Sequence, residues 1–199
     1  MVVVASDSEV GGVFGFPAVC SDPCQPLWTA ETDGPVGGVT VAGNAAYVIT
    51  RGQVMAFPLS CDGPCIASWT GAFVAGSPFA PGAISAPSVG GGEVVIGDTQ
   101  GRIWVFPDGC GARTCQPLLV ASVDDSPLHT PVVRDGVIYA TSTDGHLYAV
   151  RRDCNPAACR PVWSTFLGAA TDGSPVVSGD GVYAGDVEGR LHAYTVGGG

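Results

Sequence analysis

The sequence predicts an all-β chain, a β-propeller built from four-stranded antiparallel blades, on three observations. First, Gly145-His146-Leu147-Tyr148-Ala149-Val150, followed by Cys154, Cys159 and Trp163, recurs along the chain, with opening glycines spaced 41, 49, 44 and 44 residues apart at Gly11, Gly52, Gly101, Gly145 and Gly189. Second, 30 Gly and 16 Pro among 199 residues leave little room for long helices. Third, a strand–turn–strand period of this length is typical of propeller blades.

The expected strands follow from β-branched and aromatic runs bounded by tight turns such as Arg134-Asp135-Gly136 and Thr143-Asp144-Gly145. We expect one domain, 1–199, of five units at approximately 1–34, 35–85, 86–129, 130–174 and 175–199. The expected strands, unit by unit, are 2–5, 13–16 and 27–30; 36–41, 46–50, 53–57 and 67–71; 86–89, 93–97, 102–106 and 117–121; 131–134, 137–141, 146–150 and 161–166; and 175–178, 181–185 and 190–195.

The third strand of each unit is apolar on both faces. Leu147 and Ala149 lie on one face, and Tyr148 and Val150 on the other. A sheet with one face in water would alternate apolar with polar residues, whereas a blade is covered on both faces by its neighbours. The pattern therefore indicates stacked blades.

The strand count predicts an incomplete ring. The first unit lacks its innermost strand and the last lacks its outermost, which leaves about four and a half blades. We expect an open arc or a part of a larger propeller. The alternative is a compact ring of five sectors, with one irregular blade made from both termini.

Eight cysteines occur in four short pairs at matched positions, which predicts one local disulfide in each of the first four units. The expected bridges are Cys20–Cys24, Cys61–Cys65, Cys110–Cys115 and Cys154–Cys159. Such usage is typical of an oxidising compartment, so we expect a periplasmic, cell-surface or secreted protein. Free buried cysteines and a zinc site are the alternatives, although zinc needs four converging ligands and each pair belongs to a different unit.

Charge excludes several partners. The chain has no Lys, 8 Arg and 18 Asp or Glu, for a net charge of −10. Binding to phosphate backbones needs clustered cations, so we expect no nucleic-acid partner and no attraction to anionic membranes. No apolar stretch approaches the length of a transmembrane span. No signal peptide is apparent, because Met1 leads directly into Val2-Val3-Val4.

The run Asp144-Gly145-His146-Leu147-Tyr148-Ala149-Val150, followed by a turn and Trp163, resembles the repeat of pyrroloquinoline-quinone-type propellers. In that family the tryptophan docks between blades. The resemblance assigns this structural position to Trp28, Trp69 and Trp163, with Leu119 in the third copy. The family includes quinoprotein dehydrogenases and non-enzymatic scaffolds, among them the lipoprotein of the outer-membrane barrel-assembly machinery.

The resemblance supplies no catalytic residue and no cofactor. Family dehydrogenases use two adjacent cysteines, a calcium held by acidic and amide groups, and an Asp base. This chain has no Cys-Cys pair, and its only Asn residues are Asn44 and Asn155. We therefore expect neither a catalytic site nor a metal site.

The remaining candidates are polar residues in turns. His129 follows Asp124-Asp125 in a connection between blades, and His146 and His192 lie on expected third strands. Acidic groups beside a histidine suit metal binding or acid–base chemistry, but a solvated loop explains them equally. Asp98, Asp144 and Asp186 occupy equivalent hairpin turns, where an aspartate commonly accepts backbone hydrogen bonds.

One apolar insertion breaks the period. Eighteen residues separate Trp69 from Pro87, against 7 to 12 in the other copies, and the extra segment contains Phe73 and Phe79. Loops on rigid scaffolds commonly carry binding, so we assign these two residues to a binding loop.

These observations support two hypotheses. The first is a non-catalytic extracytoplasmic propeller that binds a protein or other ligand through its face loops. It would have a protein partner or the remainder of a larger propeller, and it would be prone to self-association. The alternative is a fragment of a quinone-dependent dehydrogenase propeller without its catalytic residues.

Overall fold

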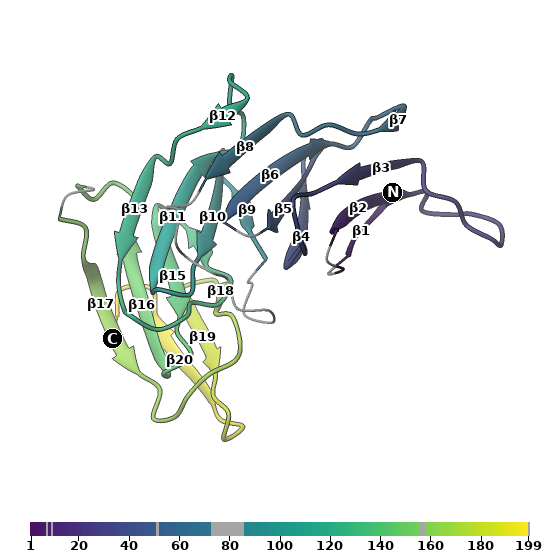
Figure 1. The fold of residues 1–199 in the computed structure, drawn as a ribbon. Coiled ribbons are helices and arrows are strands. Elements are labelled where there is room, and N and C mark those ends of the chain that lie inside the picture. Colours follow the sequence, from purple (N-terminus) through teal and green to yellow (C-terminus); the bar gives the residue numbers. More distant parts are fainter. Residues whose placement is uncertain (7, 9, 51, 73–85, 156–157, 199) are drawn as a thin grey trace.

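The structure is a computed structural model that describes residues 1–6, 8, 10–50, 52–72, 86–155 and 158–198. These residues form twenty strands in five sheets, without a helix among them. Figure 1 shows the sheets following one another along an arc, with the sheet of the N-terminal strands at one end and the sheet of the C-terminal strands at the other. The all-β class and the open arc are confirmed, and the compact ring is not the arrangement seen.

The first sheet contains β1 (Val2–Ser6), β2 (Gly12–Phe16), β3 (Trp28–Glu31) and β7 (Gly63–Pro64). The second contains β4 (Gly38–Ala42), β5 (Ala45–Thr50), β6 (Gln53–Pro58), β8 (Trp69–Ala72) and β12 (Thr114–Cys115). The third contains β9 (Ser88–Gly90), β10 (Glu93–Gly97), β11 (Arg102–Pro107) and β13 (Leu119–Ser122). The fourth contains β14 (Val132–Arg134), β15 (Val137–Thr141), β16 (His146–Arg151) and β17 (Pro161–Phe166), and the fifth β18 (Val176–Ser178), β19 (Gly181–Gly185) and β20 (Leu191–Thr195).

Strand register identifies equivalent positions in the five sheets. Val2 of β1 pairs with Phe16 of β2, as Ala46 of β5 pairs with Phe57 of β6. β1 is therefore equivalent to the second strand of a complete blade. Within the described residues, the first sheet lacks an innermost strand and the fifth lacks an outermost one, as the sequence predicts.

Turn chemistry defines the hairpins. Asp135 and Gly136, between β14 and β15, both have positive φ, at 49° and 76°. Two positive φ angles suit the right-handed twist of paired strands, and Asp-Gly adopts them readily. This turn closes the pairing of Arg134 with Val137.

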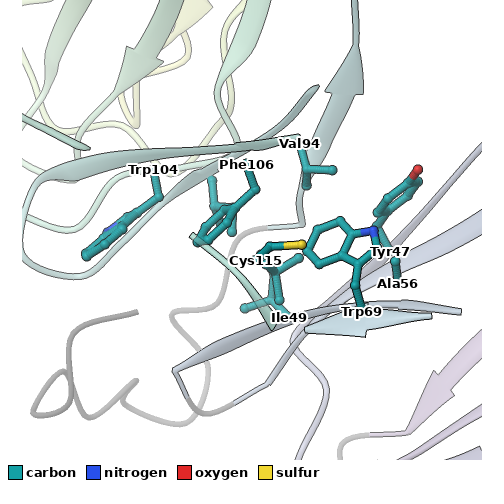
Figure 2. Close-up of a cluster of buried hydrophobic side chains, with 10 residues drawn as sticks. Tyr47, Ile49, Ala56, Trp69, Val94, Trp104, Phe106 and Cys115 are labelled. Carbon is teal, nitrogen blue, oxygen red and sulfur yellow. The ribbon is translucent and has the colours of Figure 1, made fainter. Parts of the chain in front are cut away.

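Most of the core lies between sheets. Each sheet has a leading face, which we define as the face toward the preceding sheet, and a trailing face toward the following one. Val13 and Trp28, on the trailing face of the first sheet, pack with Val48 and Phe57 on the leading face of the second. Figure 2 shows the next such cluster, where Trp69 of the second sheet packs with Phe106 of the third.

Aromatic donors hold successive sheets in register. The Trp69 indole N–H donates to the Asp108 carbonyl at 3.1 Å, and the Tyr47 hydroxyl donates to the same oxygen at 3.4 Å. Trp163 and Tyr139 donate in the same way to the Val196 carbonyl, at 3.3 and 3.1 Å. Both acceptors lie on the following sheet, two residues beyond the repeated third-strand motif.

The first sheet uses the same position. The Trp28 indole N–H donates to the Leu59 carbonyl at 3.0 Å, and Leu59 again lies two residues beyond its third-strand motif. Trp28, Trp69 and Leu119 are 2 to 4% exposed. Trp163 is only half-buried, because the fifth sheet, as described, has neither an outer strand nor a cysteine loop to cover it.

The contact between the third and fourth sheets differs. Val95 stands at the tyrosine position and Leu119 at the tryptophan position, and neither side chain can donate. Arg152, at the position of Asp108 and Val196, instead forms an ion pair with the nearly buried Glu93 of the third sheet. A charged pair thus replaces the aromatic donors at this contact.

The structure contains four disulfides, each within one loop: Cys20–Cys24, Cys61–Cys65, Cys110–Cys115 and Cys154–Cys159. The second and third loops also pair with the preceding sheet. β7 lies inside the Cys61–Cys65 loop and runs parallel to β3, with the Cys65 amide donating to the Thr29 carbonyl at 2.7 Å. β12 pairs with β8 in the same way. These two loops therefore connect neighbouring sheets.

Replacing Trp69 with alanine should lower the free energy of unfolding by about 3–5 kcal/mol, because it empties a packed inter-sheet site. Trp163→Ala should cost less, because Trp163 is less buried. Urea unfolding of both variants, followed by circular dichroism, checks the order. Equal losses in the two variants would contradict this account of the contacts.

Removing the Cys61–Cys65 bridge with paired serine substitutions should cost about 2 kcal/mol by the loop-entropy model, together with the pairing of β7 with β3. The matched control is the Cys20–Cys24 pair, which has the same separation of 4 residues. Its loop belongs to the first sheet, so the described chain has no preceding sheet with which it could pair. Hydrogen exchange should therefore rise in β3 only for the first variant. Unchanged exchange in β3 would show that the loop does not connect the sheets.

Candidate functional site

The antiparallel strands divide the loops between two rims of the arc. The hairpins between second and third strands, and the connections from one sheet to the next, lie on one side, which we call the hairpin rim. The first turns of each sheet and the cysteine loops lie on the opposite side, the cysteine rim. The hairpin rim is the candidate site, because it gathers most of the polar residues predicted to be functional.

Charge is divided unequally between the rims. Among the described residues, the cysteine rim carries five arginines and seven carboxylates, whereas the hairpin rim carries two arginines and nine carboxylates. The hairpin-rim carboxylates are Glu31, Asp33, Asp98, Asp124, Asp125, Asp144, Asp172, Asp186 and Glu188. All three histidines lie there too. The net negative charge of the chain is therefore concentrated on the hairpin rim.

Asp98 and Asp186 close equivalent hairpins. One oxygen of Asp98 accepts from the Gln100 and Arg102 amides at 2.8 and 2.9 Å, and the other accepts from Arg102 Nε at 2.6 Å and the Trp104 indole at 2.9 Å. The carboxylate is thus surrounded by donors of its own hairpin. Trp104 packs beneath the Arg102 guanidinium, which lies 5.1 Å from the ring centre.

Asp186 repeats this arrangement with a histidine in place of the tryptophan. It accepts from the Glu188 and Arg190 amides, from Arg190 Nε at 2.6 Å and from His192 Nε2 at 2.8 Å. Burial acts to raise the pKa of the Asp186 carboxyl, but the hydrogen bonds from His192 and Arg190 outweigh it and hold the pKa well below its usual range. Asp186 is therefore a fixed anion that orders its turn.

Asp144 lies in the equivalent hairpin, as predicted, but at a different position within it. Counted from the hairpin glycine, Ser142 occupies the position of Asp98, and Asp144 occupies that of Gln100. Asp144 accepts from the Ser142 hydroxyl and contacts His146 Nδ1 at 3.0 Å. Burial acts to raise its pKa, but the hydrogen bonds from Ser142 and His146 lower it overall.

An aromatic group lies beside these carboxylates, and the sequence patterns did not single it out. His146 stacks on Tyr148 at 5.9 Å and contacts Phe166 at 5.2 Å between ring centres. The Tyr148 hydroxyl donates to Asp124 at 3.0 Å. Burial is the main cause that raises the pKa of Tyr148, and the nearby Asp124 carboxylate raises it further. Phe166 is 54% exposed. Phe166 therefore offers an accessible aromatic ring beside negative charge, whereas Tyr148 is only 8% exposed.

The polar groups of the rim are mostly engaged with the chain itself. His129 Nε2 lies 2.9 Å from the Thr171 carbonyl, and His192 contacts Asp186. Within the described ranges, no three His, Cys, Asp or Glu side chains converge as metal ligands would. Nor does the described part of the chain contain a helix with the length and apolarity of a bilayer span. Phe73 and Phe79, assigned to a binding loop, lie outside the described residues.

A groove lies next to β3 and β8, the last long strands of the first two sheets. It has a volume of about 650 Å³, runs between these two sheets and is lined by Met55, Ile66 and Arg113, among others. Ile66 is 72% exposed. The groove borders β7 and β12, so sequence alone did not reveal it: both short strands depend on contacts between units.

Comparison with known sequences identifies one family. The family model described as outer membrane protein assembly factor BamB matches residues 69–199, about two thirds of the chain. No curated protein matches at a significant level.

Solved structures share the fold at low sequence identity. The computationally designed Ika8 protein matches with a TM-score of 0.73 and 10% identity, covering 98% of this chain and 55% of its own. The designed Ika4 protein matches at 0.67 and 12%, covering 87% and 99%. BamB from Moraxella catarrhalis matches at 0.54 and 17%, covering 99% and 70%. The chain thus spans about half of the length of Ika8.

The pKa of Asp186 leads to a prediction about acid stability. Because folding lowers this pKa, the ionised form stabilises the fold fully above the usual aspartate pKa of about 3.9, and the contribution is lost as pH falls below that value. Asp186→Asn should therefore flatten the decline of stability below about pH 4, measured as the urea midpoint against pH. Asp180→Asn, which alters an exposed carboxylate of the same sheet, is the control. An equally steep decline in Asp186→Asn would contradict the assignment.

Proposed function

Because the chain belongs to the family of the outer membrane protein assembly factor BamB, a family of pyrroloquinoline-quinone-type propellers, we propose that it is a non-catalytic scaffold. It acts outside the cytoplasm and binds a protein partner through the loops of the hairpin rim. Four disulfides favour an oxidising compartment.

The observation that carries the proposal is the exposed Phe166 ring, which packs on His146 near Asp124 on a predominantly acidic rim. Exposed aromatic side chains provide binding energy at protein interfaces, and surrounding charge selects and steers the partner. A rim with nine carboxylates and two arginines favours a partner with a basic contact segment.

The internal hydrogen bonds suit a scaffold better than an enzyme. Asp98 and Asp186 each accept four hydrogen bonds from their own hairpins, so they are already committed to local structure. A general acid or base needs a group that can exchange protons with a substrate. The alternative of a dehydrogenase fragment has no specific observation in its favour, since the sequence lacks adjacent cysteines.

We propose that the insertion between β8 and β9 contributes to the same binding surface. Its flanks, Ala72 and Ser88, belong to strands that end and begin at the hairpin rim. We keep Phe73 and Phe79 as proposed contact residues for the same partner.

Site-specific cross-linking tests the proposal. With a photoreactive phenylalanine analogue in place of Phe166, illumination in the native host should give one protein adduct of defined mass. Adding Asp124→Asn and Asp125→Asn should reduce the yield several-fold, and higher salt during capture should do the same, because charge steers the encounter. The control carries the same analogue at Ile66, which lines the groove between the first two sheets.

Two outcomes would contradict the assignment. Adducts formed at Ile66 but not at Phe166 would move the binding surface away from the hairpin rim. Quinone-dependent dye reduction by the purified chain supplied with calcium would contradict a non-catalytic role.

A further inference from the structure

Among the described residues, no sheet packs on the leading face of the first sheet. Val2 and Val4 are 51% and 46% exposed. At the position of Val2 the other four sheets carry residues that are fully buried: Ala46, Val94, Ile138 and Val182. At the position of Val4 they carry residues that are 0 to 2% exposed: Val48, Ile96, Ala140 and Ala184. The residues of this face are apolar, like their buried equivalents, and differ from them only in that no neighbouring sheet packs on them.

The trailing face of the last sheet shows the same relation. Leu191 is 75% exposed. Its equivalents in the other four sheets are all fully buried: Val13, Val54, Ile103 and Leu147. Ala193, two residues further along β20, is also exposed, whereas its equivalents Ala56, Val105 and Ala149 are buried.

Both ends also carry halves of the hydrogen bond that joins neighbouring sheets. Tyr183 occupies the position of Tyr47 and Tyr139, whose hydroxyls donate to the following sheet. Ala18 occupies the position of the residues whose carbonyls accept: Leu59, Asp108 and Val196. The donor position thus lies on the last sheet and the acceptor position on the first.

The cysteine loop of the first sheet is consistent with a missing neighbour. The second cysteines of the other loops, Cys65, Cys115 and Cys159, are 2 to 7% exposed, because each lies close to the preceding sheet. Cys24, at the same position in the first loop, is only half-buried.

We propose that two copies of this chain join head to tail, with the trailing face of each last sheet packed on the leading face of the other copy's first sheet. The two faces are complementary halves of one repeated contact and lie on the same molecule, so a second copy supplies both missing neighbours. The strands that the first and last sheets lack within the described ranges are edge strands, whereas the middle strands β1 and β20, which carry Val4 and Leu191, are present.

The length of the arc favours closure with two copies. The chain accounts for 55% of the Ika8 chain, a longer protein of the same fold, so two arcs supply about the length of that chain. Head-to-tail contacts form a ring when the rotation closes and an open filament when it does not. Two equal arcs give a ring with a two-fold axis.

Light scattering coupled to size-exclusion chromatography tests the proposal on the oxidised 199-residue chain. The chain should elute with a mass of about 40 kDa, twice its 20.0 kDa. Val4→Asp and Leu191→Asp should each yield monomers, because either substitution puts a charge into both contacts of the ring. Both side chains are exposed within one chain, so circular dichroism should show both variants folded. Ile66→Asp, a change at an equally exposed residue outside either face, should leave the mass unchanged.

Mixing the two variants separates head-to-tail contacts from symmetric ones. Val4→Asp retains an intact trailing face and Leu191→Asp an intact leading face, so the mixture should recover dimer through one unaltered contact. A dimer that persists in either single variant would overturn the proposal, as would a wild-type monomer at high concentration. Polymers that lengthen with concentration would overturn closure by two copies, and a mixture that stays monomeric would exclude the head-to-tail arrangement.

Discussion

The structure depends on one constraint: each sheet is apolar on both faces and needs a neighbour on both. Val48 and Ile49 of β5 point to opposite faces, and both are fully buried, one against the preceding sheet and the other against the following one. Burial of apolar area is the main favourable contribution to folding, so a single sheet of this sequence has too little cover to be stable. The stability of the arc therefore comes mainly from the contacts between neighbouring sheets, whose contributions add along the chain.

The other devices of the fold serve the same contacts. At three of the contacts, one backbone carbonyl two residues beyond the third-strand motif accepts from the tryptophan of the preceding sheet, and at two of these it also accepts from the tyrosine. The cysteine loop begins close by and, in two cases, adds a short parallel strand to that sheet. The cysteine rim is thus engaged in contacts between sheets, and most of the net charge lies on the hairpin rim.

The period and the two-faced strands made the sheets predictable, because both are properties of residues close in sequence. The short strands β7 and β12 were not predictable, since they form only when one unit meets the next. Asp98 and Asp144 lie in equivalent hairpins, as predicted, but the backbone hydrogen bonds show that Ser142 is the residue at the position of Asp98. The aromatic group of His146, Tyr148 and Phe166 combines two strands and was likewise hidden.

The substitution of Leu119 for a tryptophan has a consequence for cooperativity. In a linear array, each unit senses distant ones only through its nearest neighbours, so the weakest coupling divides the array into blocks. Between the third and fourth sheets the coupling relies on apolar packing and on the pair of Glu93 with Arg152, whose guanidinium side chain is 47% exposed. Mobile ions screen such a pair, whereas they hardly affect an indole bonded to a carbonyl. We therefore expect rising ionic strength to weaken the coupling at this contact more than at the contacts joined by an indole and a carbonyl.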